Sequence, residues 1–277
     1  EVAPTGDPIF SRMLDLIDIR LDCPDAWPPR ELPRGPLVMV ANHPFGIGDG
    51  IALLSLAERL GRPFRVMIHR DLLKISEMER YALPVDFSET KEAIANNEAV
   101  RLLREGVTIV VFPAGGVATA PRGLGKAEDL PWKIFPARLV QEAKASVIPI
   151  HFSGQNGRLF HLVSGPMHLA DSNNRAARLI GGISLTLRLS LLIREFARLS
   201  GRSIHLNVGR PLAWDELEPL RDRKSLLERI RSAVFELAPP DQVKSPRRMS
   251  AGKRGRQSAP SMLLSADDAS LANTSTS

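Results

Sequence analysis

The sequence predicts an α/β fold with a largely parallel sheet flanked by helices. Two observations lead to this prediction. Short runs rich in Val and Ile alternate along the chain with longer stretches in which apolar residues recur at helical spacing. The short runs are also apolar throughout, without the polar alternation of a half-exposed strand, and such strands are typical of a parallel sheet covered by helices on both faces.

The expected elements follow in order. Apolar runs predict strands at residues 37–41, 64–68, 108–112, 147–152 and 203–208, with a short apolar segment at 83–85. Helical spacing predicts helices at residues 8–22, from Asp49 onward, and at 71–80, 88–104, 131–144, 179–199 and 225–237. Ser88 is a suitable N-cap, and Gly106 a suitable terminator, for the helix at 88–104.

Composition and length indicate one main domain with appendages. The 277 residues are 43% hydrophobic and 25% charged, enough for a sizeable core. We expect an N-terminal helix and Pro-rich linker at residues 1–36, the main domain at 37–238, and a basic tail at 239–277. The tail is rich in Ser, Ala and Pro and is expected to be disordered.

The chain has a net charge of +6. The tail has six basic and three acidic residues, so it contributes +3 of this net charge. Such a tract attracts anionic lipid headgroups or nucleic acid. Nucleic acid is disfavoured as a partner, since the chain has one Tyr and three Trp and none lies among the basic residues. A single cysteine cannot form an internal disulfide, and no run approaches about 18 apolar residues. We therefore expect a cytoplasmic protein that does not span a membrane.

One loop stands out for its chemistry. Residues 42–50, Asn-His-Pro-Phe-Gly-Ile-Gly-Asp-Gly, directly follow the strand at 37–41. His43 lies at the strand end, and Asp49 lies at the start of the next helix, where a carboxylate can cap free N–H groups. The two side chains can face each other across a glycine-rich turn, as a general base faces the carboxylate that orients it.

Residue spacing excludes several other functional motifs for this loop and for the chain. A dinucleotide-binding fingerprint needs a third glycine three positions after Gly48, and that position is Ile51. The chain has no phosphate-binding Gly-x-x-x-x-Gly-Lys-Ser/Thr sequence and no Gly-x-Ser-x-Gly elbow. Its His and acidic residues show no metal-ligand spacing. Without a nucleophilic serine, His43 must activate a nucleophile from outside the protein.

Two further loops follow strands that should end at the same edge of the sheet, where ligands bind in open α/β folds. Residues 112–119, Phe-Pro-Ala-Gly-Gly-Val-Ala-Thr, contain two glycines whose backbone N–H groups can approach an anion, and Arg122 lies just beyond. The loop at 153–158 adds amide side chains and Arg158.

These motifs, in this order, carry a resemblance. Residues 42–50, Phe112-Pro113-Ala114-Gly115 and the strand at 147–150 are together similar to the glycerolipid (lysophosphatidic-acid) acyltransferase superfamily, and look closest to its hemolysin-like branch, associated with bacterial aminolipids such as ornithine lipids. The resemblance implies an α/β enzyme that moves an acyl group from an acyl carrier protein or coenzyme A thioester to a hydroxyl of a lyso-lipid or glycerophosphate-like acceptor.

The resemblance also implies roles for individual residues. His43 would be the general base and Asp49 the residue that orients it. The acceptor would be held by the glycine-rich loops, with the substrate-binding candidates Asn42, Phe45, Gly46, Phe112, Pro113, Ala114, Gly115, Gly116 and Arg122. No metal and no bound cofactor are expected, because acyl-CoA or acyl carrier protein serves as co-substrate. The enzyme would act peripherally at an anionic membrane surface, on the cytoplasmic face of the inner membrane.

The chain also departs from the family pattern. Five residues separate His43 from Asp49, one more than in most of the superfamily, as in the hemolysin-like branch. The loop after Phe112 lacks the glutamate and arginine of the general family, which favours an acceptor without a phosphate. Two alternatives remain open: a hydrolase that uses the same His–Asp pair on water, and a non-catalytic, membrane-associated lipid-binding module.

Overall fold

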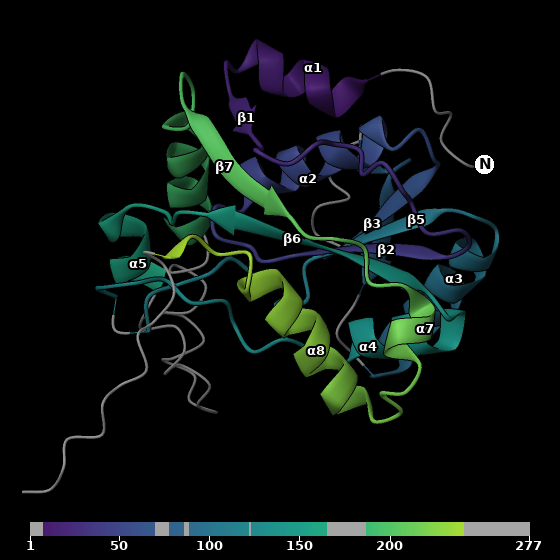
Figure 1. The fold of residues 1–277 in the computed structure, drawn as a ribbon. Coiled ribbons are helices and arrows are strands. Elements are labelled where there is room, and N and C mark those ends of the chain that lie inside the picture. Colours follow the sequence, from purple (N-terminus) through teal and green to yellow (C-terminus); the bar gives the residue numbers. More distant parts are fainter. Residues whose placement is uncertain (1–7, 70–77, 86–88, 122, 165–186, 241–277) are drawn as a thin grey trace, which may run out of the picture. The chain divides into compact units, whose positions relative to one another are not determined.

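The computed structural model describes residues 8–69, 78–85, 89–121, 123–164 and 187–240. Its centre is a seven-stranded sheet in the order β1-β7-β6-β2-β5-β3-β4 (Figure 1). The strands are β1 (Arg20–Asp22), β2 (Leu37–Ala41), β3 (Phe64–His69), β4 (Ala82–Val85), β5 (Thr108–Val111), β6 (Ser146–Ser153) and β7 (Ser203–Val208). The labelled helices are α1 (Ile9–Leu16), α2 (Ile47–Arg59), α3 (Glu89–Arg104), α4 (Phe135–Ala143), α5 (Arg158–Ser164), α7 (Trp214–Leu217) and α8 (Arg223–Phe235). Residues 187–197 are helical as well.

The sheet is mostly parallel, as the sequence predicts. β2 lies between β5 and β6 and pairs with both in parallel, and β3 continues the parallel order from β5 to β4. β7 runs antiparallel to β6, and the short β1 pairs in parallel with β7 at the edge. The fold is therefore α/β with a mixed sheet, in which the reversed strands are confined to one side.

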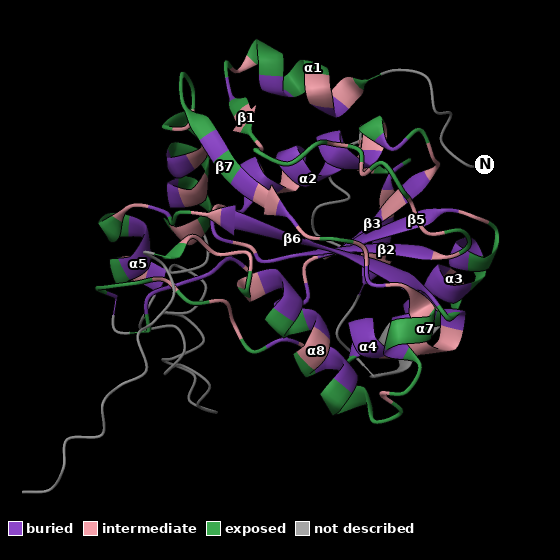
Figure 2. Ribbon diagram, in the orientation of Figure 1, coloured by how far each residue is buried: buried purple, intermediate pink, exposed green. Residues whose placement is uncertain are grey.

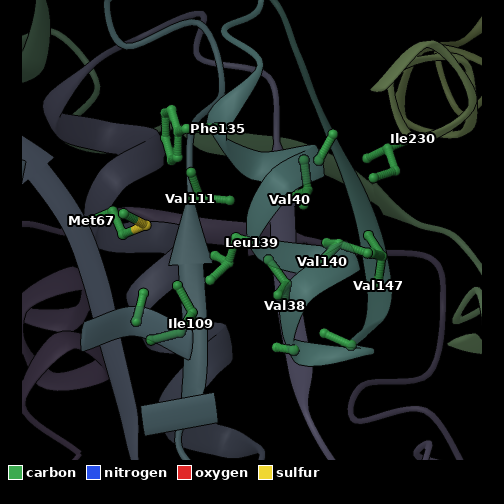
Figure 3. Packing of buried hydrophobic residues seen from close by; sticks show 14 of the residues in the cluster. Val38, Val40, Met67, Ile109, Val111, Phe135, Leu139, Val140, Val147 and Ile230 are labelled. Atoms are coloured by element: carbon green, nitrogen blue, oxygen red, sulfur yellow. The ribbon is translucent and has the colours of Figure 1, made fainter. Parts of the chain in front are cut away.

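Two apolar cores lie on opposite faces of the sheet. One joins β2, β5 and β6 to α3, α4 and α8, and Figure 3 shows Val38, Val40, Ile109 and Val111 packing against Leu139 of α4 in this core. The other joins the opposite side chains of the same strands to α1 and α2. All five residues of β2 are buried, which explains its unbroken apolar sequence, and Figure 2 shows the central strands in the colour of buried residues.

The N-terminal segment differs from the expected helix at residues 8–22. Helix α1 ends at Leu16, and Asp18 has a φ of +53°, a left-handed conformation that stops the helix. The chain then forms β1, which joins the sheet beside β7. At the other end of α1, the backbone N–H groups of Phe10 and Ser11 donate to the Glu58 carboxylate of α2. Residues 8–22 are thus tied to the main fold at both ends.

Other boundaries also shift. Helix α2 begins at Ile47, two residues before Asp49, and the expected helix at 131–144 is shortened to α4. The segment at 83–85 belongs to a strand, β4, while α5 and α7 have no counterpart in the prediction. Of the helix expected at 179–199, residues 187–197 are helical, and 179–186 lie outside the described residues. Most of the helix expected at 71–80, the proposed N-cap Ser88 and tail residues 241–277 also lie outside them.

The parallel strands bring the motif loops together. β2, β5 and β6 run in the same direction, so the chain leaves them at one edge of the sheet, toward residues 42–46, 112–119 and 154–157 respectively. Among the described residues, no helix is long and apolar enough to cross a membrane.

Candidate active site

The turn that carries His43 is anchored to the neighbouring strand by Asn42. The Asn42 side chain donates to the carbonyl oxygen of Phe152 at 2.9 Å and accepts from the backbone N–H of Phe152 at 2.7 Å. These bonds are buried and continue the β2–β6 pairing one step past the last paired residues. The chain direction at His43 is therefore fixed by the sheet, and substrate binding by Asn42 stays a prediction.

His43 and Asp49 meet as the sequence predicts. His43 Nδ1 lies 3.0 Å from Asp49 Oδ1, the Asp49 side chain is fully buried, and the His43 side chain is 16% exposed. The other oxygen, Asp49 Oδ2, accepts the backbone N–H of Phe45 at 2.8 Å. Asp49 lies in the first turn of α2, where the helix dipole favours a negative charge. Because Nδ1 faces Asp49, Nε2 is the ring nitrogen left to exchange a proton with a substrate.

A second carboxylate, Asp129, holds the backbone of His43. Asp129 Oδ1 accepts the His43 N–H at 3.1 Å, and Asp129 Oδ2 accepts the indole N–H of Trp132 at 2.9 Å. The carbonyl oxygen of His43 accepts the N–H of Ala118 at 2.8 Å. Sequence reasoning missed Asp129, because it lies in a loop before Pro131, outside every strand end and helix start that pointed to a role.

The imidazole of His43 lies against an aromatic ring. The Phe112 ring, from the residue that follows β5, stacks on it with a centroid distance of 4.1 Å and an interplanar angle of 29°. An aromatic face is electron-rich and favours a cation placed over it. Phe112 therefore limits the orientations open to the His43 ring and stabilises its protonated form.

The surroundings raise the pKa of His43 above its ordinary value. Burial by itself would lower this pKa, but the charge of Asp49 and its contact with the ring outweigh burial, and the charge of Asp129 adds to them. The charge of Arg188 opposes the increase. Burial also raises the pKa of Asp129, against the lowering effect of the N–H groups of Trp132 and His43. The result is an imidazole that binds a proton more readily than a free one.

The loop after β5 is a tight turn packed into the fold. The Gly115 N–H donates to the Phe112 carbonyl at 3.0 Å, and Gly115 has a φ of +64°. Ala114 is buried in the α3–α4–α8 core, and the carbonyl of Pro113 accepts the Lys133 N–H. A Cβ on Gly116 would lie 2.9 Å from Leu130 Cδ1. Acceptor binding by this loop stays a prediction, and Arg122 lies outside the described residues.

The turn at Phe45 and Gly46 is covered by other parts of the chain. The Phe45 ring lies where a Cβ on Gly154 would be, with Cζ only 2.5 Å from that position. Gly46 has a φ of +85°, and a Cβ on it would lie 2.8 Å from Leu192 Cδ1 and 3.0 Å from Val117 Cγ2. Glycine is therefore required at 46 for backbone conformation and for space.

Another histidine near this edge has a different environment. His151 is buried within β6, and its ring meets the Phe235 ring edge-on at a centroid distance of 6.0 Å. Burial and the charge of Lys126 lower the pKa of His151 to about 4. His151 is thus neutral near pH 7. In the part of the chain that the structure describes, no three His, Cys, Asp or Glu side chains are grouped so that they could hold a metal ion.

The structure thus places His43 against a buried carboxylate, at the edge where three loops meet. In the comparison with known families, residues 29–238 match the family described as Acyltransferase. The chain belongs to this family. The match spans the turn of His43, the loop after β5 and strands β2 to β7, so the resemblance found in the sequence is confirmed, while the hemolysin-like branch stays a prediction.

This acyltransferase has curated relatives in two bacteria. It is 23% identical over 209 residues to a lyso-glycine lipid O-acyltransferase of Phocaeicola vulgatus, an alignment that covers 74% of this chain and 69% of the relative. It is 24% identical over 213 residues to a lyso-glycine lipid O-acyltransferase of Bacteroides thetaiotaomicron, with 74% and 72% covered. Among solved structures, it resembles the 1-acyl-sn-glycerophosphate (LPA) acyltransferase PlsC of Thermotoga maritima, at 17% identity and a TM-score of 0.49, over 86% of this chain and 78% of that one.

Proposed function

We propose that the protein is an O-acyltransferase that moves a fatty acyl group from a thioester, on acyl carrier protein or coenzyme A, to the hydroxyl of a lysolipid, with His43 as general base. The observation that carries this proposal is the 3.0 Å contact between His43 Nδ1 and the buried Asp49 carboxylate, in a chain of the acyltransferase family. Because Nδ1 faces Asp49, Nε2 of the partly exposed imidazole is available to accept a proton from the substrate.

The chemistry balances with this one base. Nε2 of His43 takes the proton of the acceptor hydroxyl as its oxygen attacks the thioester carbonyl, and Asp49 stabilises the resulting imidazolium. The carbon–sulfur bond then breaks, the new ester remains on the lipid, and the proton passes from His43 to the departing thiolate. A positioned base of this kind contributes about 10²–10⁴-fold to the rate. The protein itself forms no covalent intermediate.

We infer that the acceptor is an aminolipid of the lyso-glycine type. Both curated relatives are named for that acceptor and match about three quarters of this chain. The loop at 112–119 has no arginine or lysine to bind a phosphate, which agrees with an acceptor of another class. Ornithine lipid precursors belong to the same chemical class and are the second acceptor to test.

The decisive experiment combines purified enzyme, a lyso-glycine lipid and a radiolabelled acyl donor, with lysophosphatidic acid, a lyso-ornithine lipid and buffer alone as acceptors. We expect labelled diacylated glycine lipid from the wild type, and about 10²–10⁴-fold less from His43→Ala, by the contribution of a general base. Parallel reactions with acyl-CoA and acyl carrier protein identify the donor. His151→Ala is the matched control, because His151 is a buried histidine of the same sheet that has no part in the proposal.

The alternatives give different results. A hydrolase would release free thiol and free fatty acid at the same rate with and without lysolipid, and acylated lipid would be missing. A non-catalytic module would bind lipid equally well as wild type and as His43→Ala, with no thiol release from either. Either outcome would overturn the proposal.

We also propose peripheral attachment to an anionic membrane, at the cytoplasmic face of the inner membrane. Exposed leucines and an isoleucine occur on α5 and on helix 187–197: Leu159, Leu162, Leu187, Leu189 and Ile193. Both segments pack beside the turn of His43, through a cluster that includes Val117, Phe160 and Leu191. Apolar side chains next to the site, in a chain of net charge +6, suit a negatively charged bilayer.

Vesicle sedimentation tests this attachment. The double variant Leu189→Ser/Ile193→Ser should bind vesicles of phosphatidylglycerol less tightly than the wild type. Leu16→Ser changes a leucine on α1 that is even more exposed and should have no effect. Equal binding by all three proteins would remove this surface from the proposal, and recovery of the protein away from the inner-membrane fraction of cells would remove the location.

A further inference from the structure

Helix 187–197 places a positively charged side chain beside the turn of His43. The helix lies against the turn of His43, since Leu192 is the side chain that a Cβ on Gly46 would meet first. One turn earlier on this helix is Arg188, half-buried at the same surface. No motif in the sequence marks Arg188 for a role.

The guanidinium of Arg188 lies beside the loop that holds His43. Its Nη2 donates to the carbonyl oxygen of Val117 at 3.4 Å, and its Cζ lies 5.7 Å from the centre of the Phe160 ring. Val117 directly precedes Ala118, whose N–H donates to the His43 carbonyl. The charge of Arg188 also reaches the imidazole, where it lowers the pKa of His43. The cation and the base therefore belong to one site.

Arg188 has no acidic partner among the described residues. The contacts that the structure gives it are to a carbonyl oxygen and to an aromatic ring, both neutral. The nearest acid along its helix, Glu195, is engaged elsewhere: it accepts the Gly157 N–H at 2.7 Å and lies 3.3 Å from Arg198. Burial accordingly lowers the pKa of Arg188 with no carboxylate to offset it.

A guanidinium withdrawn from water without a counter-charge costs free energy, which an anionic ligand would recover. Its five N–H donors form a planar fork that matches the two oxygens of a carboxylate, or a pair of phosphate oxygens. One long N–H···O contact leaves most of these donors free for such a ligand. The loop at 112–119, which borders the same site, supplies no cation of its own.

We propose that Arg188 binds the acidic headgroup of the acceptor lipid and so positions the acceptor hydroxyl at His43. This inference rests on the proposed function and names the residue that would select the acceptor. An acceptor built on N-acylated glycine keeps one free carboxylate, which is the anion this fork suits. Arg188 would act as a specificity-determining residue, and His43 would remain the base.

The test pairs a charged acceptor with a neutral one. Steady-state kcat and KM are measured for a hydroxyacyl-glycine acceptor and for its methyl ester, with wild type, Arg188→Gln, Arg188→Lys and Arg194→Gln. A charge-assisted hydrogen bond is worth about 1.5–3 kcal/mol, so we expect Arg188→Gln to raise KM for the acid roughly 10- to 150-fold. KM for the ester should change little, and Arg188→Lys should lie between. Arg194→Gln is the matched control, an exposed arginine on the same helix.

Coenzyme A also carries anionic groups, its phosphates. A second set of reactions therefore tests whether Arg188 contacts the donor or the acceptor headgroup. Acyl-CoA is compared with acyl-pantetheine, which lacks the phosphates of coenzyme A, at saturating acceptor. If Arg188→Gln lowers the rate only with acyl-CoA, Arg188 binds the donor and the proposal is overturned. Equal losses with the acid and the ester would also overturn it, because a headgroup contact must depend on the headgroup charge.

A binding measurement tests the contact between Arg188 and the headgroup independently of the proposed acyl transfer. Calorimetry with His43→Ala measures binding of the acid and the ester in the absence of turnover. Tighter binding of the acid, lost in His43→Ala/Arg188→Gln, supports the headgroup contact even if the wild type transfers no acyl group. Equal affinity of the two ligands for His43→Ala would overturn the contact even if the wild type is an active acyltransferase.

Discussion

The backbone N–H of His43 donates to the carboxylate of Asp129, which lies 86 residues later in the chain. The ring of the same histidine meets a different carboxylate, that of Asp49. One acid therefore fixes where the main chain of His43 runs, and the other contacts its imidazole and raises its pKa. The separation of these tasks gives distinct expectations for the two acids.

Replacing Asp129 should reduce stability and activity together. Asp129→Ala leaves the His43 N–H and the Trp132 indole N–H without their acceptor, and each unpaired buried donor costs about 1–3 kcal/mol. Asp129→Asn keeps one acceptor oxygen and should lose less. Urea unfolding and kcat measure the two effects. If Asp129→Ala proves as stable and as active as the wild type, Asp129 has no positioning role.

The rate should fall on the acid side at a pH set by His43. A general base works only when neutral, and the pKa of His43 is raised, so kcat/KM should begin to fall at a pH above the ordinary histidine value of about 6.5. Asp49→Asn removes the strongest charge that raises this pKa, so the acid limb should move to lower pH while kcat drops. A limb that stays in place in Asp49→Asn would assign the titration to another group.

The same raised pKa links stability to pH. A protonated His43 interacts more favourably in the folded state, so its contribution is complete below about pH 6.5, the unfolded value. It is lost as the pH rises through the higher folded value. In His43→Gln the free energy of unfolding should therefore change less across this window than in the wild type. Urea titrations at pH 5.5 to 8.5 measure the difference, and identical slopes would contradict a raised pKa.

Gly46 should be intolerant of any side chain. Gly46→Ala combines a strained backbone, which costs about 1–3 kcal/mol, with displacement of Leu192 and Val117. Gly61 also has a positive φ, of +66°, but has open space around its Cβ position, so Gly61→Ala measures the cost of a positive φ without displaced side chains. We expect Gly46→Ala to be the less stable of the two in denaturant and to lose activity. Equal stability would mean that helix 187–197 does not press on the turn.

Asn42 should support activity by stabilising the fold around His43. Asn42→Ala leaves the buried N–H and carbonyl of Phe152 unpaired, at a cost of about 1–3 kcal/mol for each group. We expect a lower free energy of unfolding and a lower kcat, with KM for the acceptor nearly unchanged. A large increase in KM at unchanged stability would instead support the substrate contact that the sequence suggests.

The central part of the fold was predictable because its signals are local. The five residues of β2 are buried on both faces and therefore had to be apolar in sequence. The turn from His43 to Asp49 is similarly contained in seven residues, so the pair could be identified by counting. β1 was missed because its three residues, Arg20–Asp22, have no strand pattern and acquire their conformation by pairing with β7.

The rest of the site depends on contacts between distant segments. Asp129 and Arg188 lie in a loop and on a helix that no motif marks, and only the folded chain brings them to His43. The family resemblance implies substrate binding by Asn42, but both ends of its amide are bonded to the main chain of Phe152. Proximity in sequence was thus enough to predict the contact between His43 and Asp49, whereas the contacts of the other residues required the fold.

The stacking of Phe112 on His43 makes the imidazole of His43 observable in solution. Protons above the face of an aromatic ring are shielded by its circulating electrons, so the imidazole C–H resonances of His43 should lie upfield of those of the other histidines. A headgroup or thioester that shifts the ring by a fraction of an ångström would change this shielding. The resting enzyme thus contains its own spectroscopic probe, with which substrate arrival can be followed before any bond is made.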